Sequence, residues 1–306
     1  MRQFLCDSFP DGSGKLVVTG KNYRYLVKVL RFSEGEELDA RLPDGKLVRF
    51  YVERVQPQLM SAVLRLVDGA DGCSGTTQGV QAFEVQEIAD RMPELWLFQF
   101  LPKQQKMDLI VRQATECGVR HIVPISGAYS LKGDSSGRKE RWERIIREAR
   151  QQSGSAVATE IKEVLSVRAA AELWTKIAAN AASRSETAPV DAANAASRSS
   201  ADSTDNVGAV SPTASAAGAS KSMFKTVAFL LDENPSAGKS SLARANKAEV
   251  SAAALAVGCE GGISDEERSV LLEAGFMPLH FTTNILRAET ASLYGIAVIQ
   301  QFLSAD

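Results

Sequence analysis

From residue 95 onward, short apolar runs alternate with longer amphipathic stretches. Runs of this length are typical of buried strands, and the longer stretches carry their apolar residues at helical spacing. The apolar runs are 95–101, 121–126, 160–167, 226–233, 253–258 and 276–281, and the helical stretches are 104–118, 137–154, 168–178, 264–275 and 288–303. Strands that alternate with helices form mainly parallel sheets with helices on their faces. The pattern therefore predicts an α/β domain on a mainly parallel sheet.

The first 70 residues follow a different pattern, in which apolar and polar residues alternate with period two. The alternating segments are 15–20, 36–42, 46–55 and 60–67, and "PDGK" between two of them is typical of a hairpin turn. We expect a small β-barrel with one helix at 22–32. On that helix, Arg24, Lys28 and Arg31 recur at intervals of four and three, which would place them on one face. This face is either solvated or in contact with RNA.

A chain of 306 residues suits two domains, each large enough to bury its own core. We place the β-barrel domain at 1–70, a glycine- and threonine-rich linker at 71–82 and the α/β domain at 83–306. Residues 178–222 are almost all small or polar, and "AANAASRS" occurs twice. Such a composition buries too little apolar surface to offset the entropy of ordering. We predict a disordered insertion at 178–222, and a regulatory or partner-binding role for it stays open.

Composition argues against several classes of protein. No apolar run approaches the roughly 18 residues that a membrane helix needs, so we expect a cytoplasmic protein. The four cysteines contain no CxxC pair, and the two histidines, His121 and His280, are separated by more than half the chain. Neither a zinc site nor a histidine-based triad is indicated, and we expect no metal. The net charge of −2 hides a basic segment, because residues 102–150 hold 11 basic and 6 acidic side chains. A local basic face of this kind is what nucleic-acid binding requires.

The segment "VGCEGGISDEE", 257–267, is a glycine-rich turn between an apolar run and an acidic helix start. Its glycines do not have the G-x-G-x-x-G spacing of a dinucleotide site. The nearby "NPSAGKSS" lacks the first glycine of a phosphate-binding loop, where Glu233 stands instead. Ser264 and Glu267 form a capping box, which predicts that a helix begins near residue 265. Gly261 and Gly262 would permit positive φ and close approach of a ligand. A plain structural turn and a ligand pocket both remain open on this segment alone.

A second polar turn, "NILRAETASLYG", follows about twenty residues later. Arg287, Glu289 and Thr290 interrupt an apolar run where a helix should start. Glu289 or Thr290 could simply cap that helix while Arg287 is solvated. Two polar turns lie close together in the sequence, each after a short apolar run. Together they favour a ligand site more strongly than either turn does alone.

Five stretches of the chain together resemble a known family. They are similar to motifs of the bacterial RsmE family, and they read "GCEGGIS", "ILRAETA", "LPKQQKMDLIVRQATECGV", "RWERIIREARQQSG" and "YRYLVKVLR" followed by "GEEL". Members of that family are small-subunit ribosomal RNA uridine-N3 methyltransferases. The resemblance covers nearly the whole chain except the insertion. The main departure is Cys259, which stands where the family usually has proline.

The resemblance implies a PUA-like N-terminal barrel and a SPOUT-type trefoil-knotted α/β methyltransferase domain, an exception to the rule that chains avoid threading. It also implies S-adenosylmethionine (SAM) as cofactor, a homodimer, and 16S ribosomal RNA or the small ribosomal subunit as partner. The implied SAM-binding residues lie in three loops and are Leu231, Asp232, Glu233, Gly258, Glu260, Gly261, Gly262, Ile285, Leu286, Arg287, Ala288 and Thr290. The implied RNA contacts are Arg24, Lys28, Arg31, Lys103, Lys106, Arg138 and Arg141.

The implied reaction needs help at the acceptor atom. Uridine N3 carries a proton at neutral pH and becomes a good nucleophile only when that proton is lost. We expect Arg287 to stabilise negative charge on the uracil, with Glu289 or Glu260 as the base or as the group that orients Arg287. Two other interpretations stay open, namely a non-catalytic RNA-binding or ribosome-assembly protein and a SPOUT methyltransferase that acts on a different RNA base.

Overall fold

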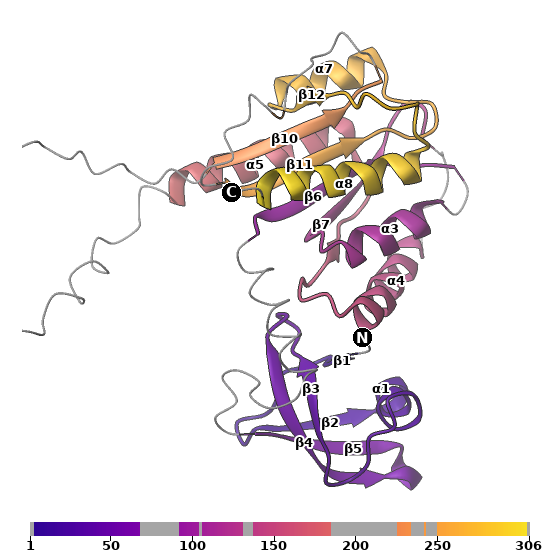
Figure 1. Ribbon diagram of the computed structural model, residues 1–306, viewed down its shortest axis with the longest axis vertical. Helices are drawn as coiled ribbons and strands as arrows, with labels where there is room; N and C mark the ends of the chain where they lie inside the picture. The colour runs from indigo at the N-terminus through magenta and orange to yellow at the C-terminus, as the bar shows by residue number, and fades with distance from the viewer. Residues whose placement is uncertain are drawn as a thin grey trace, which may run out of the picture.

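The computed structural model describes most of two adjoining parts of the chain (Figure 1). The described residues are 3–67, 92–103, 106–130, 137–184, 225–233, 242 and 250–304. The linker expected at 71–82 lies outside them, as does most of the expected insertion. Residues 178–184, which the sequence analysis assigns to the insertion, instead continue a helix that ends at Arg184. Alanine is the best helix former, and this stretch, AANAASR, is rich in it.

The N-terminal part is a curled five-stranded sheet (Figure 1). Its strands are β1 (Phe4–Leu5), β2 (Lys15–Thr19), β3 (Glu37–Arg41), β4 (Leu47–Gln56) and β5 (Ser61–Leu66), with a 3-10 turn at Pro57–Leu59. The order across the sheet is β1-β3-β4-β5-β2. Over the residues described here, the edge strands β1 and β2 do not pair with each other. The expected small β-barrel is therefore an open, curled sheet over these residues.

A short helical segment covers this sheet, and it is less regular than expected. Helix α1 (Gly20–Arg24) passes into a π-helical turn at Tyr25–Val29, in which the amide of Leu30 donates to the carbonyl of Tyr25 at 2.9 Å. Arg31 lies beyond the helix with φ of 64°. The expectation that Arg31 shares a helix face with Arg24 and Lys28 is wrong, because the wider π turn breaks the spacing of four and three. All three side chains are exposed.

The C-terminal part is built on a seven-stranded sheet in which every strand pair is parallel. Its strands are β6 (Glu94–Phe100), β7 (His121–Ser126), β8 (Glu160–Ile161), β9 (Leu165–Ser166), β10 (Lys225–Leu231), β11 (Val250–Val257) and β12 (Met277–Leu279). The order is β12-β10-β11-β6-β7-β8, and β9 also pairs with β7. The predicted α/β domain on a parallel sheet is confirmed. The run expected as one strand at 160–167 is two short strands.

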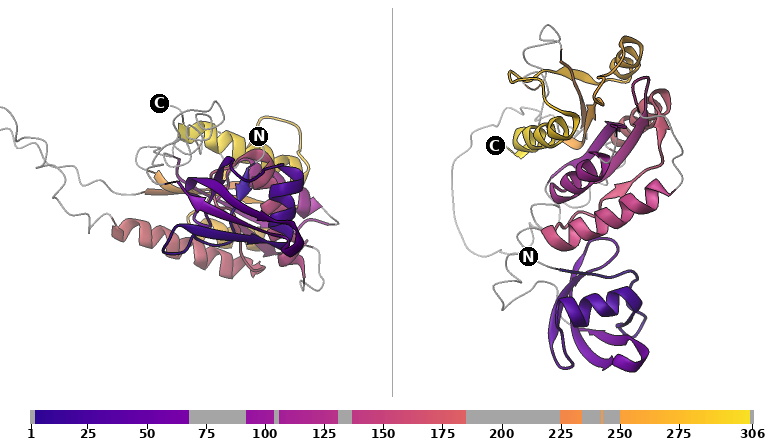
Figure 2. Two further views of the ribbon diagram at one scale, coloured as in Figure 1. Left: turned by 90° about the horizontal axis from the view of Figure 1, so that it is seen from below. Right: turned by 90° about the vertical axis from the view of Figure 1, so that its right-hand side faces the viewer.

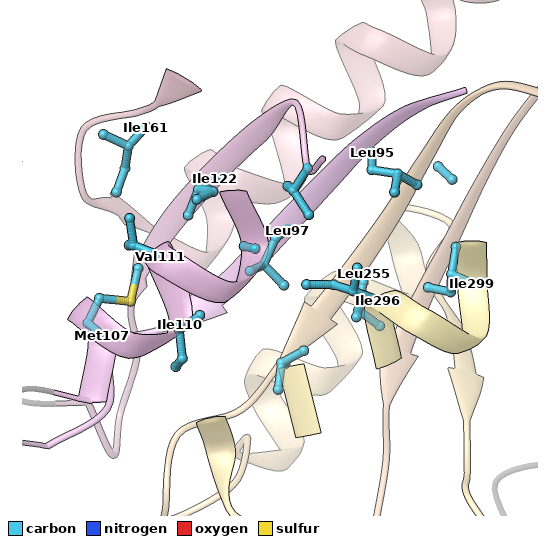
Figure 3. Close-up of a cluster of buried hydrophobic side chains, with 14 of the residues drawn as sticks. Leu95, Leu97, Met107, Ile110, Val111, Ile122, Ile161, Leu255, Ile296 and Ile299 are labelled. Atoms are coloured by element: carbon cyan, nitrogen blue, oxygen red, sulfur yellow. The ribbon is translucent and has the colours of Figure 1, made fainter. Parts of the chain in front are cut away.

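Helices cover both faces of this sheet (Figures 1 and 2). They are α3 (Lys106–Glu116), α4 (Arg138–Ser153), α5 (Val167–Arg184), α7 (Asp265–Glu273) and α8 (Ala288–Ser304). On one face, α3, α4 and α8 bury aliphatic side chains such as Leu97, Ile110, Leu255 and Ile296 (Figure 3). On the other face, α5 and α7 pack over a cluster that contains Phe98. The parallel sheet is thus buried on both faces, which explains its nearly continuous apolar strands.

Two structural properties bear on the kind of protein. None of the helices in the described part of the chain is long and apolar enough to cross a membrane. Across the same residues, no group of three or more His, Cys, Asp or Glu side chains is placed to hold a metal ion. Cys6, Cys117 and Cys259 are free thiols.

Candidate functional site

A cavity of about 440 Å³ lies at the edge of the sheet where β10, β11 and β12 end. Because these strands are parallel neighbours, the loops that follow their carboxyl ends meet at this edge, the usual place for ligands in open α/β sheets. The first loop supplies Leu230, Leu231, Asp232 and Glu233, the second Val257 to Ile263 with Arg268, and the third Leu279, His280, Phe281, Thr283, Asn284, Ile285, Leu286, Arg287, Ala288 and Ala291.

The second loop is closed by its own backbone. The amide of Gly262 donates to the carbonyl of Cys259 at 3.0 Å, and Gly262 has φ of +74°. Cys259 is buried, and its thiol lies 3.7 Å from the carbonyl oxygen of Gly262. The turn is therefore closed by its own hydrogen bonds, with cysteine at the position where the resembled family has proline.

Gly261 is glycine for a different reason from the one expected. Its φ is not positive, so the expected left-handed conformation occurs at Gly262 and not at Gly261. A Cβ atom at Gly261 would lie 2.8 Å from the Cβ of Tyr129, a residue of the loop after β7. A side chain at position 261 would thus collide with that loop, and the glycine permits the close approach.

The capping box at the start of α7 is confirmed, and its glutamate makes one contact more. The amide of Glu267 donates to the Ser264 hydroxyl at 3.3 Å, and the amide of Ser264 donates to the Glu267 carboxylate at 3.0 Å. The other Glu267 oxygen accepts from the amide of Ala128 at 2.6 Å. The carboxylate therefore fixes the helix start and also ties it to the loop after β7.

The first loop is held by α7 and by the third loop. Arg268 of α7 donates through Nε to the Asp232 carboxylate at 2.7 Å. The ring Nδ1 of His280 lies 3.0 Å from the carbonyl oxygen of Asp232. Arg268 and His280 both line the cavity, and the sequence analysis missed both. His280 belongs to the predicted short strand that precedes the third loop, so its proximity to the loop was the available signal.

A buried glutamine joins the second loop to α8. Gln99 is fully buried at the end of β6, and its Nε2 lies 2.9 Å from the carbonyl of Phe100 and 3.3 Å from that of Gly258. The hydroxyl of Ser292, also buried, lies 2.5 Å from Gln99 Oε1 and 2.8 Å from the carbonyl of Ala288. Gln99 is the polar residue within the apolar run "LWLFQFL". Its burial with satisfied polar groups indicates that it positions two walls of the cavity.

An ammonium group joins the second and third loops. Lys106 Nζ lies 2.8 Å from Glu260 Oε1 and 3.6 Å from Glu289 Oε2. The amide of Lys103 donates to both Glu260 oxygens, at 3.2 and 3.0 Å. Burial alone raises the pKa of Glu260, but the hydrogen bonds from Lys106 and from the Lys103 amide outweigh it, so this pKa lies below its usual value. The hydrogen bond to Glu260 likewise raises the pKa of Lys106.

Replacing Lys106 by methionine is expected to lower stability at neutral pH but not in acid. Because the pKa of Glu260 is lower in the folded protein, its ion pair stabilises the fold fully above the pKa of an unfolded glutamate, about 4.3. This stabilisation is lost as the pH falls through the pKa of the folded state. Because the pKa of Lys106 is higher in the folded protein, its ion pair stabilises the fold fully below the pKa of an unfolded lysine, about 10.4. This stabilisation is lost as the pH rises through the pKa of the folded state. Urea unfolding of wild type and Lys106→Met across this range measures the difference. Lys176→Met, an exposed change on α5, is the control. A difference independent of pH would show that the ion pair does not stabilise the fold.

The structure brings together most of the residues proposed from the sequence. All the implied SAM-binding residues line the cavity except Thr290, which is exposed on the first turn of α8. Glu289 points to Lys106 and does not line the cavity. Ile285 is 80 % exposed, and Arg287 is exposed. Among the implied RNA contacts of the second domain, Arg141 pairs with Asp108, while Lys103 is exposed beside Glu260.

Two family models match this chain. The RNA methyltransferase domain matches residues 90–209 and 192–300. The RNA methyltransferase PUA domain matches residues 18–65. Together they follow the division into an N-terminal sheet and a C-terminal α/β domain, and the first alone covers well over half of the chain.

Curated proteins with similar sequences carry one name. The protein called ribosomal RNA small subunit methyltransferase E of Aquifex aeolicus is 39 % identical over 84 residues, which is 26 % of this chain and 37 % of that protein. Ribosomal RNA small subunit methyltransferase E 2 of Borreliella burgdorferi is 26 % identical over 166 residues, 53 % of this chain and 61 % of that protein. The Bacillus subtilis methyltransferase E is 23 % identical over 165 residues, 52 % and 56 % respectively. The matched part thus spans between about a third and three fifths of these relatives.

Solved structures share the fold over nearly the entire chain. The ribosomal RNA small subunit methyltransferase E of Neisseria gonorrhoeae, described as bound to SAM, has a TM-score of 0.65 at 19 % identity and covers 98 % of this chain and 97 % of that one. A Legionella pneumophila protein, described with bound SAM, has a TM-score of 0.60 at 19 % identity, with 98 % of each chain covered. The two matched domains and their order agree with the fold, and the chain belongs to the RNA methyltransferase domain family of RsmE type.

Proposed function

We propose that the chain binds SAM in the cavity at the ends of β10, β11 and β12 and methylates N3 of a uridine in 16S ribosomal RNA. The observation that carries this proposal is the convergence of the three loops on one cavity in a chain of this family. The cavity volume falls within the range of small-molecule sites, roughly 300–1,000 Å³. The similar proteins described with bound SAM support the choice of ligand.

The residues present fit such a cofactor. Exposed backbone groups of the second loop, from Gly258 to Gly262, offer hydrogen bonds to a purine, and the apolar side chains of Leu231 and Leu286 offer packing surface. The Asp232 carboxylate is paired with Arg268, which holds it in place at the wall of the cavity. Bound SAM would supply a methyl group on a sulfonium, ready for in-line displacement. The protein's main task would then be to hold donor and acceptor in position.

Within the proposed reaction, Arg287 stabilises negative charge on the uracil, and Glu289 is better suited than Glu260 to act as base or as orienter of Arg287. Glu260 already accepts hydrogen bonds from Lys106 and from the Lys103 amide, which hold its pKa low and make it a weak base. Glu289 Oε2 is buried and has no hydrogen-bond partner among the described residues, although Lys106 Nζ lies 3.6 Å away. A buried carboxylate oxygen in this state can accept a proton or a hydrogen bond.

We also propose the trefoil knot and the homodimer that the resemblance implies. Helix α7 packs on the same face as α5, whereas α8 packs on the opposite face against α3 (Figure 2). The segment 280–287 therefore passes from one face to the other at the edge where the loop after β10 lies, which is how a threaded chain would run. Ile285 and the Phe281–Tyr294 ring pair, with Tyr294 42 % exposed, leave apolar surface beside the cavity for a second subunit. Light scattering after gel filtration tests the dimer.

Charge reversal on the proposed RNA surface is expected to weaken RNA binding and to leave SAM binding unchanged. The variants are Arg24→Glu, Lys28→Glu and Arg138→Glu, because these side chains make no ion pair among the described residues. Each lost phosphate contact should reduce the slope of log K against log [salt] by about 0.7 to 0.9. Fluorescence anisotropy with a labelled RNA at several salt concentrations measures the slope. If SAM affinity fell instead, the RNA surface would have been assigned to the wrong side chains.

Calorimetric titration with SAM tests the cofactor proposal. We expect saturable binding of SAM and none of ATP, because the chain has no phosphate-binding loop with the required glycines. A non-catalytic RNA-binding relic of the family would bind SAM poorly. Absence of heat with SAM, under conditions where the protein is folded, would remove the proposed function.

A further inference from the structure

A second cavity, of about 560 Å³, lies where the two domains meet. It is lined by Leu5, Cys6, Lys139, Glu143, Ile146, Arg147, Arg150, Thr159, Glu160, Ile161, Lys162 and Glu163. Gln3 joins the domains beside it, since its side-chain amide donates to the carbonyl of Arg150 at 2.8 Å. Strand β8, which forms one wall, is at the opposite edge of the sheet from β12. This cavity is therefore separate from the proposed SAM site.

Arg150 is the unusual side chain in this cavity. The other basic groups of its lining are neutralised, because Lys139 pairs with Glu163, Arg147 with Asp7 and Lys162 with Glu160. Over the described ranges, Arg150 has no carboxylate within 4.0 Å, and its Nε and Nη2 atoms are buried without a hydrogen-bond partner. Arg150 as a whole is half-buried, but leaving two of its guanidinium nitrogens buried without a partner is unfavourable.

The surroundings of Arg150 add to this positive charge. Burial, together with the nearby guanidinium groups of Arg41, Arg120 and Arg147, lowers the pKa of Arg150 to about 10. Arg41 is itself fully buried in the N-terminal sheet. Glu143, the lining carboxylate that is not in one of the pairs above, is exposed and makes no hydrogen bond or ion pair with Arg150 in the described part of the chain. Arg150 is thus the basic side chain of the lining that has no carboxylate partner among the described residues.

We infer that this cavity binds a phosphate group through Arg150. Arg150 lines the cavity, and a guanidinium without a counterion there is a ligand for phosphate, which it can bind in a bidentate contact when two of its nitrogens face the phosphate. The phosphate is either inorganic phosphate or a phosphodiester of an RNA that crosses from the N-terminal domain to the α/β domain. The RNA source rests on the proposed function, whereas the inorganic source does not.

The first experiment compares thermal stability with and without inorganic phosphate. In phosphate-free buffer at low salt, Arg150→Met is expected to raise Tm by about 3 °C, because it removes a half-buried charge that has no counterion. Phosphate is expected to raise the Tm of wild type and not that of the variant. Arg150→Gln is expected to behave like Arg150→Met, and Arg168→Met, an exposed change on α5, should respond to phosphate as wild type does.

The second experiment identifies the source of the phosphate. The salt dependence of binding to a labelled single-stranded 20-nucleotide RNA is measured for wild type and Arg150→Met. If the site holds an RNA phosphodiester, the slope of log K against log [salt] falls by about 0.7 in the variant. If the slope is unchanged while the phosphate-dependent rise in Tm is lost, the ligand is inorganic phosphate. In either case the site exists as inferred.

The inference is overturned by either of two results, each together with an unchanged salt slope of RNA binding. In the first, phosphate raises the Tm of wild type and of both Arg150 variants equally. In the second, phosphate raises the Tm of none of these three proteins. A lower Tm of both variants in phosphate-free buffer would also overturn it, since it would show that Arg150 is already compensated. Titration of the same samples with SAM separates this outcome from a failure of the proposed function. A protein that binds phosphate through Arg150 but does not bind SAM would retain this site and lose the proposed reaction.

Discussion

Replacing Arg287 by alanine is expected to lower the single-turnover rate of methyl transfer by about 10²- to 10³-fold at saturating SAM. Loss of one group that stabilises developing negative charge has an effect of this size in other enzymes. Glu289→Gln is expected to lower the rate as well, because the amide cannot take the N3 proton. Transfer of radiolabelled methyl from SAM to 16S ribosomal RNA under single-turnover conditions measures both.

Matched exposed substitutions control for general effects of charge removal. They are Arg168→Ala on α5 and Glu273→Gln on α7, both expected to react at the wild-type rate. SAM binding is measured on every sample, so that rates refer to loaded protein. If both Arg287→Ala and Glu289→Gln reacted at near-wild-type rates with SAM binding retained, neither residue would have the proposed role.

Replacing Gln99 by leucine is expected to destabilise the fold by about 2 kcal/mol or more and to raise the Kd for SAM. The change leaves the buried Ser292 hydroxyl without one of its partners and removes the donor to the Gly258 carbonyl, and each such loss costs about 1–3 kcal/mol. The SAM effect follows because Gln99 joins the second loop to the start of α8. Urea unfolding measures the stability, and calorimetry the affinity.

A double-mutant cycle with Ser292→Ala separates the pair from its surroundings. Each single substitution leaves a buried polar group without its partner, whereas the double substitution removes both partners. The double variant is therefore expected to lose less free energy of unfolding than the sum of the losses in Gln99→Leu and Ser292→Ala. Additive costs would show that the hydroxyl and the amide do not depend on each other. SAM affinity equal to that of wild type in Gln99→Leu would show that Gln99 supports the fold alone.

Features set by neighbouring residues could be predicted from the sequence. The alternation of strands and helices from residue 95 gave the parallel sheet, and the three-residue spacing of Ser264 and Glu267 gave the capping box. Both depend on local periodicity or on a contact within one helical turn. The family resemblance pointed to the three loops. They could then be grouped into one site, because neighbouring parallel strands end at the same edge of a sheet.

Features set by distant residues could not be predicted in the same way. Gly261 is glycine because of Tyr129, and no local rule contains that contact. Lys106 counts as one more basic residue in a basic segment, yet its partners come from the loop after β11 and from the first turn of α8. The N-terminal strands were recognised from their alternation, but closure of the sheet depends on whether its two edges meet. Arg31 lies outside the predicted helix because a π turn precedes it. Helix propensity does not predict where such a turn occurs.

The most direct test of the proposed function is mass spectrometry of 16S ribosomal RNA from cells that lack this gene. The account predicts that one uridine loses its N3 methyl group. A plasmid copy of the wild-type gene should restore the methyl group, and a copy with Arg287→Ala should not. Ribosomal RNA with unchanged 3-methyluridine, or with a methyl group lost from another base, would contradict the account.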